Sequence, residues 1–208
     1  MKGLFIKELY MAWKNFRFFF LVSVAFIAMS TLGEGNPFML TYPAIIGSLL
    51  PVSVLSFDEK AGWDRYSLIF PLSRAQLVSS KYLLSLLVSA VTLLTYGLFV
   101  LLKLLLQGRA AVDFSLLLSV YLPLLATAML LPSAFIFPCV FKWGSQKGSL
   151  AYYLVIMLVL VLLFLGLQIV KSPDDQLSWY LPFLPMLAAA LFYLSWLLSV
   201  AIYKEKSF

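Results

Sequence analysis

The chain of 208 residues has no histidine, one cysteine and few charged residues. Histidine is the commonest general base and metal ligand, so its absence excludes Ser-His-Asp triads and H-E-x-x-H zinc sites. The single cysteine, Cys139, cannot form an intrachain disulfide. It lies in an apolar run, where a cysteine most often serves as a small buried residue. We therefore expect no catalytic residue and no metal site.

The sequence also lacks the G-x-x-x-x-G-K-[ST] loop that binds the phosphates of ATP. The most similar string, GSQKGS at 144–149, has the wrong spacing. We therefore expect that the chain is not an enzyme and binds neither ATP nor Mg itself. The net charge of +6 does not indicate a nucleic-acid partner, because no basic domain stands apart from the apolar runs.

What the chain has in excess is apolar sequence. It is 63% hydrophobic and 12% charged, whereas soluble domains have about 45–50% and 25%. Its apolar runs have lengths near the roughly 20 residues that cross a bilayer. The pattern predicts an all-α, polytopic membrane protein with one transmembrane domain, residues 1–208. The six expected spans are 18–32, 38–57, 82–106, 114–141, 149–170 and 181–203.

Charged residues are nearly absent from these spans. Only Lys103 is charged, and it lies near a span end where its side chain can reach the interface. A proton-coupled transporter or a membrane-embedded enzyme usually needs acidic residues in its spans, so both classes are disfavoured. Three prolines should bend the fourth span, and Pro182 and Pro185 leave open a re-entrant element within 171–185.

The first 17 residues form a separate pattern. Apolar residues recur at three- and four-residue spacing, and basic residues fall mostly on the other face of the helical wheel. This is typical of an amphipathic helix lying in the membrane interface, although a plain charged lead-in to the first span stays open. The residues expected at this interface are Lys2, Lys7, Trp13, Lys14 and Arg17.

The distribution of basic residues predicts the orientation. With both termini in the cytoplasm, 12 of the 15 basic residues fall on the cytoplasmic side, and only Lys103, Arg109 and Lys171 fall outside. Cytoplasmic loops carry the excess of Lys and Arg, so we expect an even number of spans. The 12 residues are Lys2, Lys7, Lys14, Arg17, Lys60, Arg65, Arg74, Lys81, Lys142, Lys147, Lys204 and Lys206.

The loop 58–81 is the polar exception, because the stretch 57–81 holds seven of the chain's 24 formal charges. Large side chains such as Trp63 and Tyr66 are flanked there by charges, which is typical of a protein interface. The alternative to a protein interface is that these Trp and Tyr side chains rest on lipid headgroups. Ser73 and Gln76 match a capping box, which predicts a helix that starts there, projects about two turns and continues as the third span.

The run DEK-x-x-WDRY-x-x-x-x-P-x-S-R-x-x-x-V-x-S-K-Y, from Asp58 to Tyr82, resembles the signature region of small six-span permeases of the ABC-2 type exporter superfamily. The likeness includes the amphipathic N-terminus, the six spans and the missing ATPase domain. The relatives it most resembles are membrane subunits of bacterial exporters of phenol-soluble modulins and other peptides. The large outer domain of some relatives is missing, which disfavours polysaccharide and lipid-flipping subtypes.

The resemblance implies a coupling helix between spans two and three that docks on a cytoplasmic ABC ATPase, which binds ATP and Mg. It also implies a second permease copy, a homo- or heterodimer, in the bacterial plasma membrane. Docking residues implied by position are Glu59, Trp63, Asp64, Arg65, Tyr66 and Leu68. Pro71, Ser73 and Arg74 would fix the turn into the third span.

The expected function is export of an amphipathic peptide or similar hydrophobic substrate, driven by a separate ATPase docking on residues 58–74. A different class stays open: a membrane immunity or regulatory protein that sequesters a toxic peptide without transporting it. A neighbouring reading frame encoding an ATPase would favour the exporter.

Overall fold

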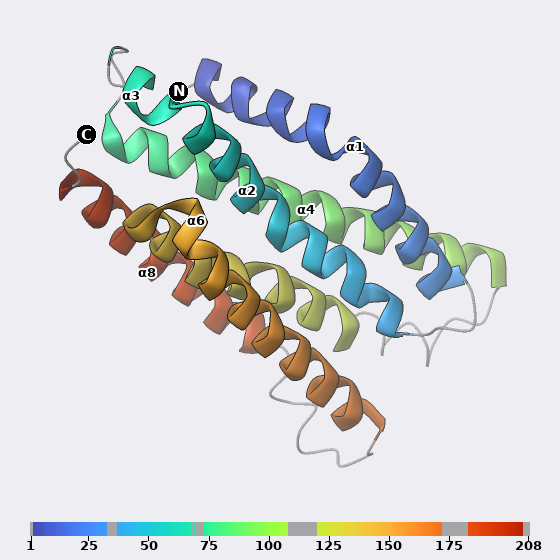
Figure 1. Ribbon diagram of the computed structural model, residues 1–208. Coiled ribbons are helices and arrows are strands. Elements are labelled where there is room, and N and C mark those ends of the chain that lie inside the picture. The colour runs from blue at the N-terminus through green and yellow to red at the C-terminus, as the bar shows by residue number, and fades with distance from the viewer. Residues whose placement is uncertain are drawn as a thin grey trace.

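The computed structural model describes residues 2–32, 37–67, 69, 73–107, 120–171 and 183–205, and within them every regular element is helical. This confirms the all-α prediction for the described part of the chain. The helices form an elongated bundle (Figure 1). They are α1 (Lys2–Leu32), η1 (Pro37–Leu40), α2 (Thr41–Lys60), α3 (Trp63–Ser67), α4 (Arg74–Gln107), α6 (Leu122–Lys171) and α8 (Phe183–Glu205).

Five helical stretches in the described residues are long and apolar enough to cross a membrane. They are Gly3–Thr31, Thr41–Lys60, Arg74–Leu106, Leu122–Gly144 and Phe183–Glu205. The remaining expected span, 149–170, lies in the later part of α6, most of whose side chains are outside the described residues. Six spans therefore stay a prediction, as does a re-entrant element in 171–185, because residues 172–182 are outside the described residues.

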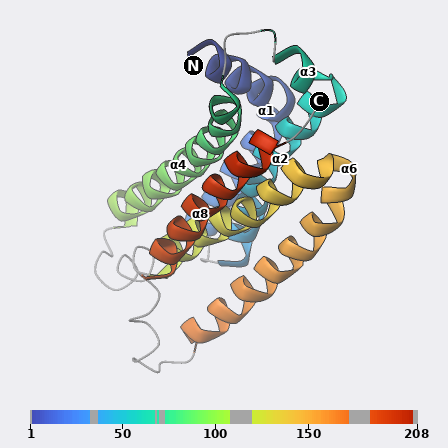
Figure 2. The same ribbon diagram turned by 90° about the vertical axis from the view of Figure 1, so that its left-hand side faces the viewer.

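α6 is two helical arms joined at Gly144. This glycine has φ 80° and ψ 168°, which residues with a side chain rarely adopt. After it the chain reverses, so the two arms run antiparallel (Figures 1 and 2). Pro132 and Pro138, expected to bend the fourth span, lie inside the first arm. The reversal at Gly144 lies between the fourth and fifth expected spans, 114–141 and 149–170.

α1 is one helix of 31 residues where two segments were expected. No helix end separates the segment 1–17 from the span 18–32. At 1.5 Å per residue α1 is about 46 Å long, against a hydrocarbon core of about 30 Å. Its first turns therefore extend beyond the core, and their placement along the membrane surface stays a prediction.

α4 begins where the capping box predicted. The Gln76 backbone N–H donates to Ser73 Oγ at 3.2 Å, and the Ser73 N–H donates to Gln76 Oε1 at 3.0 Å. These two bonds satisfy backbone donors that the first turn of a helix leaves without partners. The projecting turns and the third span are thus a single helix of 34 residues.

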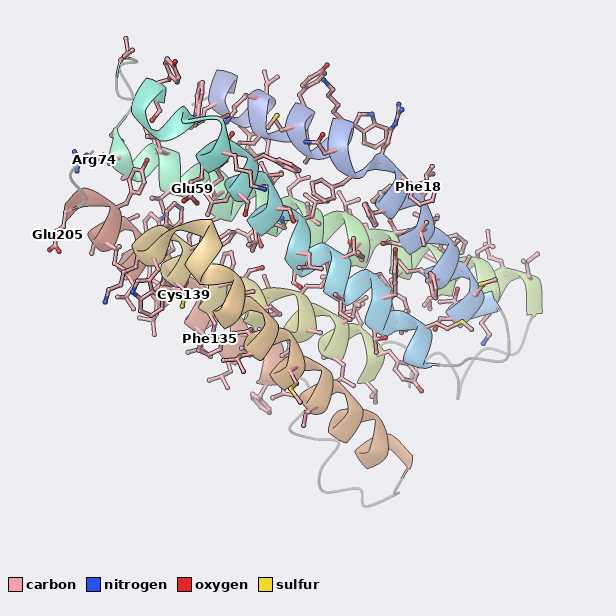
Figure 3. All side chains as sticks on the ribbon, in the orientation of Figure 1. Phe18, Glu59, Arg74, Phe135, Cys139 and Glu205 are labelled. Carbon is pink, nitrogen blue, oxygen red and sulfur yellow. The ribbon has the colours of Figure 1, made fainter. Side chains whose placement is uncertain are left out.

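The N-terminus, α3 and the end of α8 lie at the same end of the bundle, which we call the α3 end (Figures 1 and 2). Glu59, Arg74 and Glu205 mark this end in Figure 3. Because α1 starts and α8 finishes there, both ends of the described chain are on one side of the bundle. This geometry is compatible with an even number of crossings.

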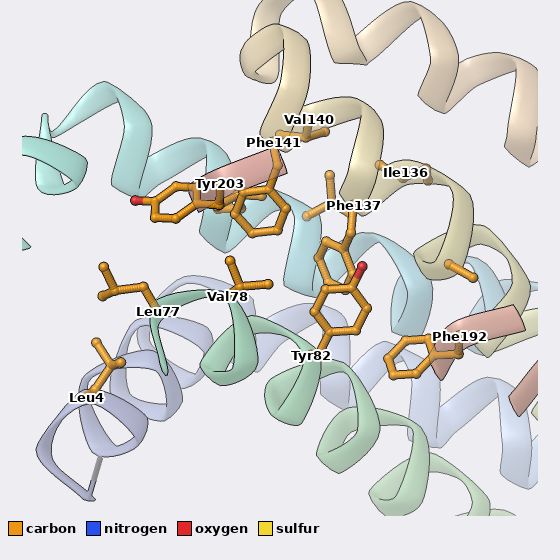
Figure 4. Close-up of a cluster of buried hydrophobic side chains, with 13 residues drawn as sticks. Leu4, Leu77, Val78, Tyr82, Ile136, Phe137, Val140, Phe141, Phe192 and Tyr203 are labelled. Carbon is orange, nitrogen blue, oxygen red and sulfur yellow. The ribbon is translucent and has the colours of Figure 1, made fainter. Parts of the chain in front are cut away.

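A buried aromatic cluster supports the α3 end from within the bundle (Figure 4). Tyr82 of α4 packs against Phe137 of α6 and Phe192 of α8, with ring centroids 4.6 and 5.0 Å apart. The Tyr82 hydroxyl lies 2.7 Å from the hydroxyls of both Ser195 and Ser199. Side-chain hydrogen bonding between helices is common in membrane bundles, and here it joins α4 to α8.

Candidate functional site

α3 is a short helix set outside the bundle by a tight turn. After α2 ends at Lys60, the Ala61 N–H donates to the Phe57 carbonyl and the Gly62 N–H to the Glu59 carbonyl, each at 3.0 Å. Gly62 has φ 67°, a left-handed conformation that favours glycine. The turn therefore redirects the chain while giving two of the last carbonyls of α2 a hydrogen-bond partner.

The side chains predicted to dock a partner divide into an outward and an inward group. Tyr66 is 61% exposed, and Ile69, which was not among the predicted docking residues, is 79% exposed three residues later. Glu59 is exposed at the end of α2. Asp64 and Arg65 lie in α3, but their side chains, like residues Leu68 and Pro71, are outside the described residues. The outward surface of described residues is thus formed by Tyr66 and Ile69, while the carboxylate of the exposed Glu59 lies beside Gly144 of α6.

Trp63 belongs to the inward group. It is partly buried and packs against the aromatic cluster below α3. The Lys7 ammonium of α1 lies 4.2 Å from the centre of its ring, within the range of a cation–π interaction. Trp63 therefore anchors α3 to the bundle, and the N-terminal half of α1 takes part in that anchor.

Beneath α3 lies a group of four charges from three helices, which we call the four-charge cluster: Lys7, Glu8, Asp58 and Lys81. The side chains of Glu8, Asp58 and Lys81 are 0%, 3% and 6% exposed, and that of Lys7 is 26% exposed. Lys81 Nζ donates to Glu8 Oε2 at 2.6 Å and also to Asp58 Oδ2. Lys7 Nζ donates to Asp58 Oδ1 at 2.5 Å and lies 3.4 Å from Glu8 Oε1.

Two cations and two carboxylates cancel, so the cluster carries no formal net charge. Burying such groups is unfavourable unless each finds a partner of opposite sign and further hydrogen bonds. Here Lys81 and Lys7 each contact both carboxylates. The cluster therefore joins α1, α2 and α4 to one another at this point.

The sequence reasoning missed this cluster, because it placed Lys7 on a surface helix and Asp58 and Lys81 in a cytoplasmic loop. One signal could have found it. Glu8 is the only acidic residue among the first 17, and it stands four residues after Leu4 and four before Ala12. Residues at this spacing share a helix face. Leu4, Glu8 and Ala12 are all buried.

Arg74 has a structural partner rather than an outward position. Its guanidinium donates to the carbonyl of Lys204 at 2.6 Å and to that of Tyr203 at 3.4 Å. The last carbonyls of a helix have no partner within it, and a basic side chain satisfies them well. Arg74 thereby joins the start of α4 to the end of α8.

The residues expected at the membrane interface lie along α1 in different settings. Trp13 is 63% exposed, and Lys14 and Arg17 are exposed. Lys2 begins the helix, although its side chain is outside the described residues. Lys7 departs from the expectation most, since it belongs to the four-charge cluster. Cys139, expected to be buried, is only half-buried on α6.

Comparison with known proteins gives one informative result. Residues 3–204 match the protein-family model described as ABC-2 family transporter protein. This match covers nearly the whole chain, including α3 and the four-charge cluster. No curated protein matches the sequence.

Proposed function

Because the chain belongs to the ABC-2 family of transporter proteins and is a permease subunit of an ABC transporter, we propose that it exports its substrate when a separate cytoplasmic ATPase docks on α3. The observation that carries this proposal is the position of α3. This helix presents Tyr66 outward, is followed by the exposed Ile69, and lies at the end that holds both described chain ends.

The outward surface has the character of a docking site. A tyrosine and an isoleucine are exposed next to each other, with the charged Glu59 and Lys60 close by in the sequence. Interfaces gain most of their binding energy from a few large side chains, surrounded by a polar rim. The N-terminal end of α1 lies next to this surface and is a second candidate contact for the ATPase.

The four-charge cluster supplies the mechanical link from this surface to the bundle. α3 follows α2 after two residues, and Trp63 packs on Lys7. Lys7 in turn contacts Asp58 and Glu8, and Lys81 ties both carboxylates to α4. A displacement of α3 by the ATPase would therefore be passed to α1, α2 and α4 together. α4, 34 residues long, would carry it across the membrane as a tilt.

Several finer features belong to the same proposal. The α3 end faces the cytoplasm of a bacterial cell, as the bias of basic residues supports. Two copies of the permease assemble around the path, because one chain of 208 residues is small for a large substrate. The substrate is an amphipathic peptide or a similar hydrophobic molecule, as the likeness of the run Asp58–Tyr82 to peptide exporters suggests.

The test compares two pairs of exposed apolar residues. Tyr66→Ala with Ile69→Ala changes the outward surface, and Leu105→Ala with Leu106→Ala changes side chains of similar exposure at the other end of α4. We expect the first pair to weaken copurification with the ATPase encoded beside the permease by about 30-fold, since one hot spot contributes about 2 kcal/mol. We expect the second pair to copurify like the wild type.

Equal copurification of both pairs would overturn docking on α3. A further arm separates export from sequestration of a toxic peptide. In cells that carry the permease with an ATPase whose phosphate-loop lysine is replaced, export stops and the peptide accumulates inside. If the cells instead stay fully protected from the toxic peptide without ATP hydrolysis, the protein sequesters the peptide and does not export it.

A further inference from the structure

A groove of about 500 Å³ lies between α1 and α4. Its walls are apolar side chains of both helices with a small contribution from α2. Representative residues are Trp13, Phe16 and Phe20 on α1, and Leu84, Leu87 and Val88 on α4. Arg17 is the only charged residue in the lining.

The lengths of the two helices place the groove at a membrane boundary. Counting back about 20 residues from the far end of α1, at Leu32, puts the edge of the hydrocarbon core near Trp13. The same count from Leu106 on α4 reaches Leu87. On both helices, the edge of the hydrocarbon core that is nearer the α3 end therefore falls within the groove. Phe20 and Val88 lie deeper in the core than this edge.

Arg17 lies about one turn further into the span than Trp13, and its exposed side chain can reach back to this boundary, where it would attract an anionic group. A guanidinium stays charged in proteins, and it pairs well with phosphate oxygens. No carboxylate lines the groove, and within the described residues no ion pair involves Arg17. An anion bound at Arg17 would therefore come from outside the described chain.

We propose that this groove binds an anionic phospholipid from the leaflet on the α3 side, with an acyl chain between α1 and α4 and the phosphate at Arg17. An apolar groove at this depth is open to lipid chains, and basic pockets between membrane helices bind anionic headgroups. A second copy packed groove to groove would cover the apolar walls, but its own lining holds no carboxylate that could pair with Arg17. A phospholipid supplies an acyl chain for the apolar walls and a phosphate for the Arg17 guanidinium.

The groove is adjacent to the four-charge cluster. Ala12 and Leu84, which line it, stand about one turn along their helices from Glu8 and Lys81. Both pack in a buried group with Leu50 and Val54 of α2. A lipid in the groove would therefore stabilise the packing of α1 on α4 next to the cluster.

The experiment titrates the purified permease in detergent with phosphatidylglycerol or phosphatidylcholine of identical chains and counts bound lipids by native mass spectrometry. The wild type should prefer phosphatidylglycerol. Arg17→Gln should reduce this preference about fivefold, since a basic residue near an anionic headgroup contributes about 1 kcal/mol. Arg17→Lys should retain it. Lys14→Gln is the matched control, because Lys14 is exposed on the same helix but does not line the groove.

A second variant tests the apolar part of the site. Leu87→Trp narrows the groove and keeps Arg17, so it should reduce binding of both lipids. Equal losses in Arg17→Gln and Lys14→Gln would show diffuse attraction to a basic surface and overturn the proposal. Unchanged lipid binding in Arg17→Gln and Leu87→Trp would overturn it as well. So would Leu87→Cys forming a disulfide between two copies, because the groove would then be a dimer contact. None of these outcomes depends on an ATPase.

Discussion

Replacing Lys81 by methionine tests the four-charge cluster. The change keeps an unbranched side chain of similar length in α4 and removes the cation that contacts both Glu8 and Asp58. Lys7 is then the remaining cation of the cluster. It lies 2.5 Å from Asp58 but 3.4 Å from Glu8, so Glu8, whose side chain is 0% exposed, loses its shorter contact.

The expected cost is large for a single substitution. Removing one partner of a buried ion pair leaves a charge without compensation and destabilises by about 3–5 kcal/mol. The lower figure already corresponds to more than a hundredfold change in the unfolding equilibrium. The assay is unfolding of the purified permease in detergent, followed by intrinsic tryptophan fluorescence. Lys103→Met is the control, because Lys103 is a lysine of the same helix outside the cluster; it should change stability by less than about 0.5 kcal/mol.

A compensating variant sharpens this test. Lys81→Met with Glu8→Met removes one charge of each sign and leaves the contact between Lys7 and Asp58. Replacing a buried pair by apolar side chains of similar size is often neutral, so the double variant should be more stable than Lys81→Met alone. Wild-type stability in Lys81→Met, or a double variant less stable than the single one, would refute the reasoning.

Two further predictions concern the turns that frame the site. Gly144→Ala should lower the free energy of unfolding by about 1–3 kcal/mol, because φ is 80° and the new Cβ would lie 2.7 Å from Glu59 Oε1. Gly97→Ala is the control and should not destabilise, because Gly97 is helical and a Cβ there would have no atom within 4 Å. Ser73→Ala should cost about 1 kcal/mol through loss of the helix cap. Hydrogen exchange should then rise in the first turn of α4 but not of α8. Thermal unfolding checks the glycine pair, and wild-type behaviour of Gly144→Ala or Ser73→Ala would contradict the corresponding geometry.

The sequence predicted the features that depend on local patterns. Apolar runs identified membrane-spanning helices, and the bonds between Ser73 and Gln76 confirm the start of α4 at the expected residue. The family resemblance carried by the run Asp58–Tyr82 agrees with the match over residues 3–204. These signals depend on residues that are close together in the sequence, so they can be recognised in a single sequence.

Features that depend on contacts between helices could not be predicted in this way. Glu8 and Lys81 are 73 positions apart, and each alone resembles a solvated charge. Trp63 looked like an outward anchor, but Lys7 and the aromatic cluster hold it against the bundle. The reversal at Gly144 lies between the expected spans 114–141 and 149–170, but the left-handed backbone that makes it could not be read from the sequence.

Site-specific photo-cross-linking tests the central claim most directly. A photoreactive phenylalanine analogue is placed at Tyr66, which is 61% exposed on α3, or at Leu105, which is 75% exposed at the far end of α4. Both variants are irradiated in cells that carry the complete transporter. Docking on α3 predicts a covalent adduct with the ATPase from position 66 and none from position 105. An adduct from position 105 with none from position 66 would contradict it.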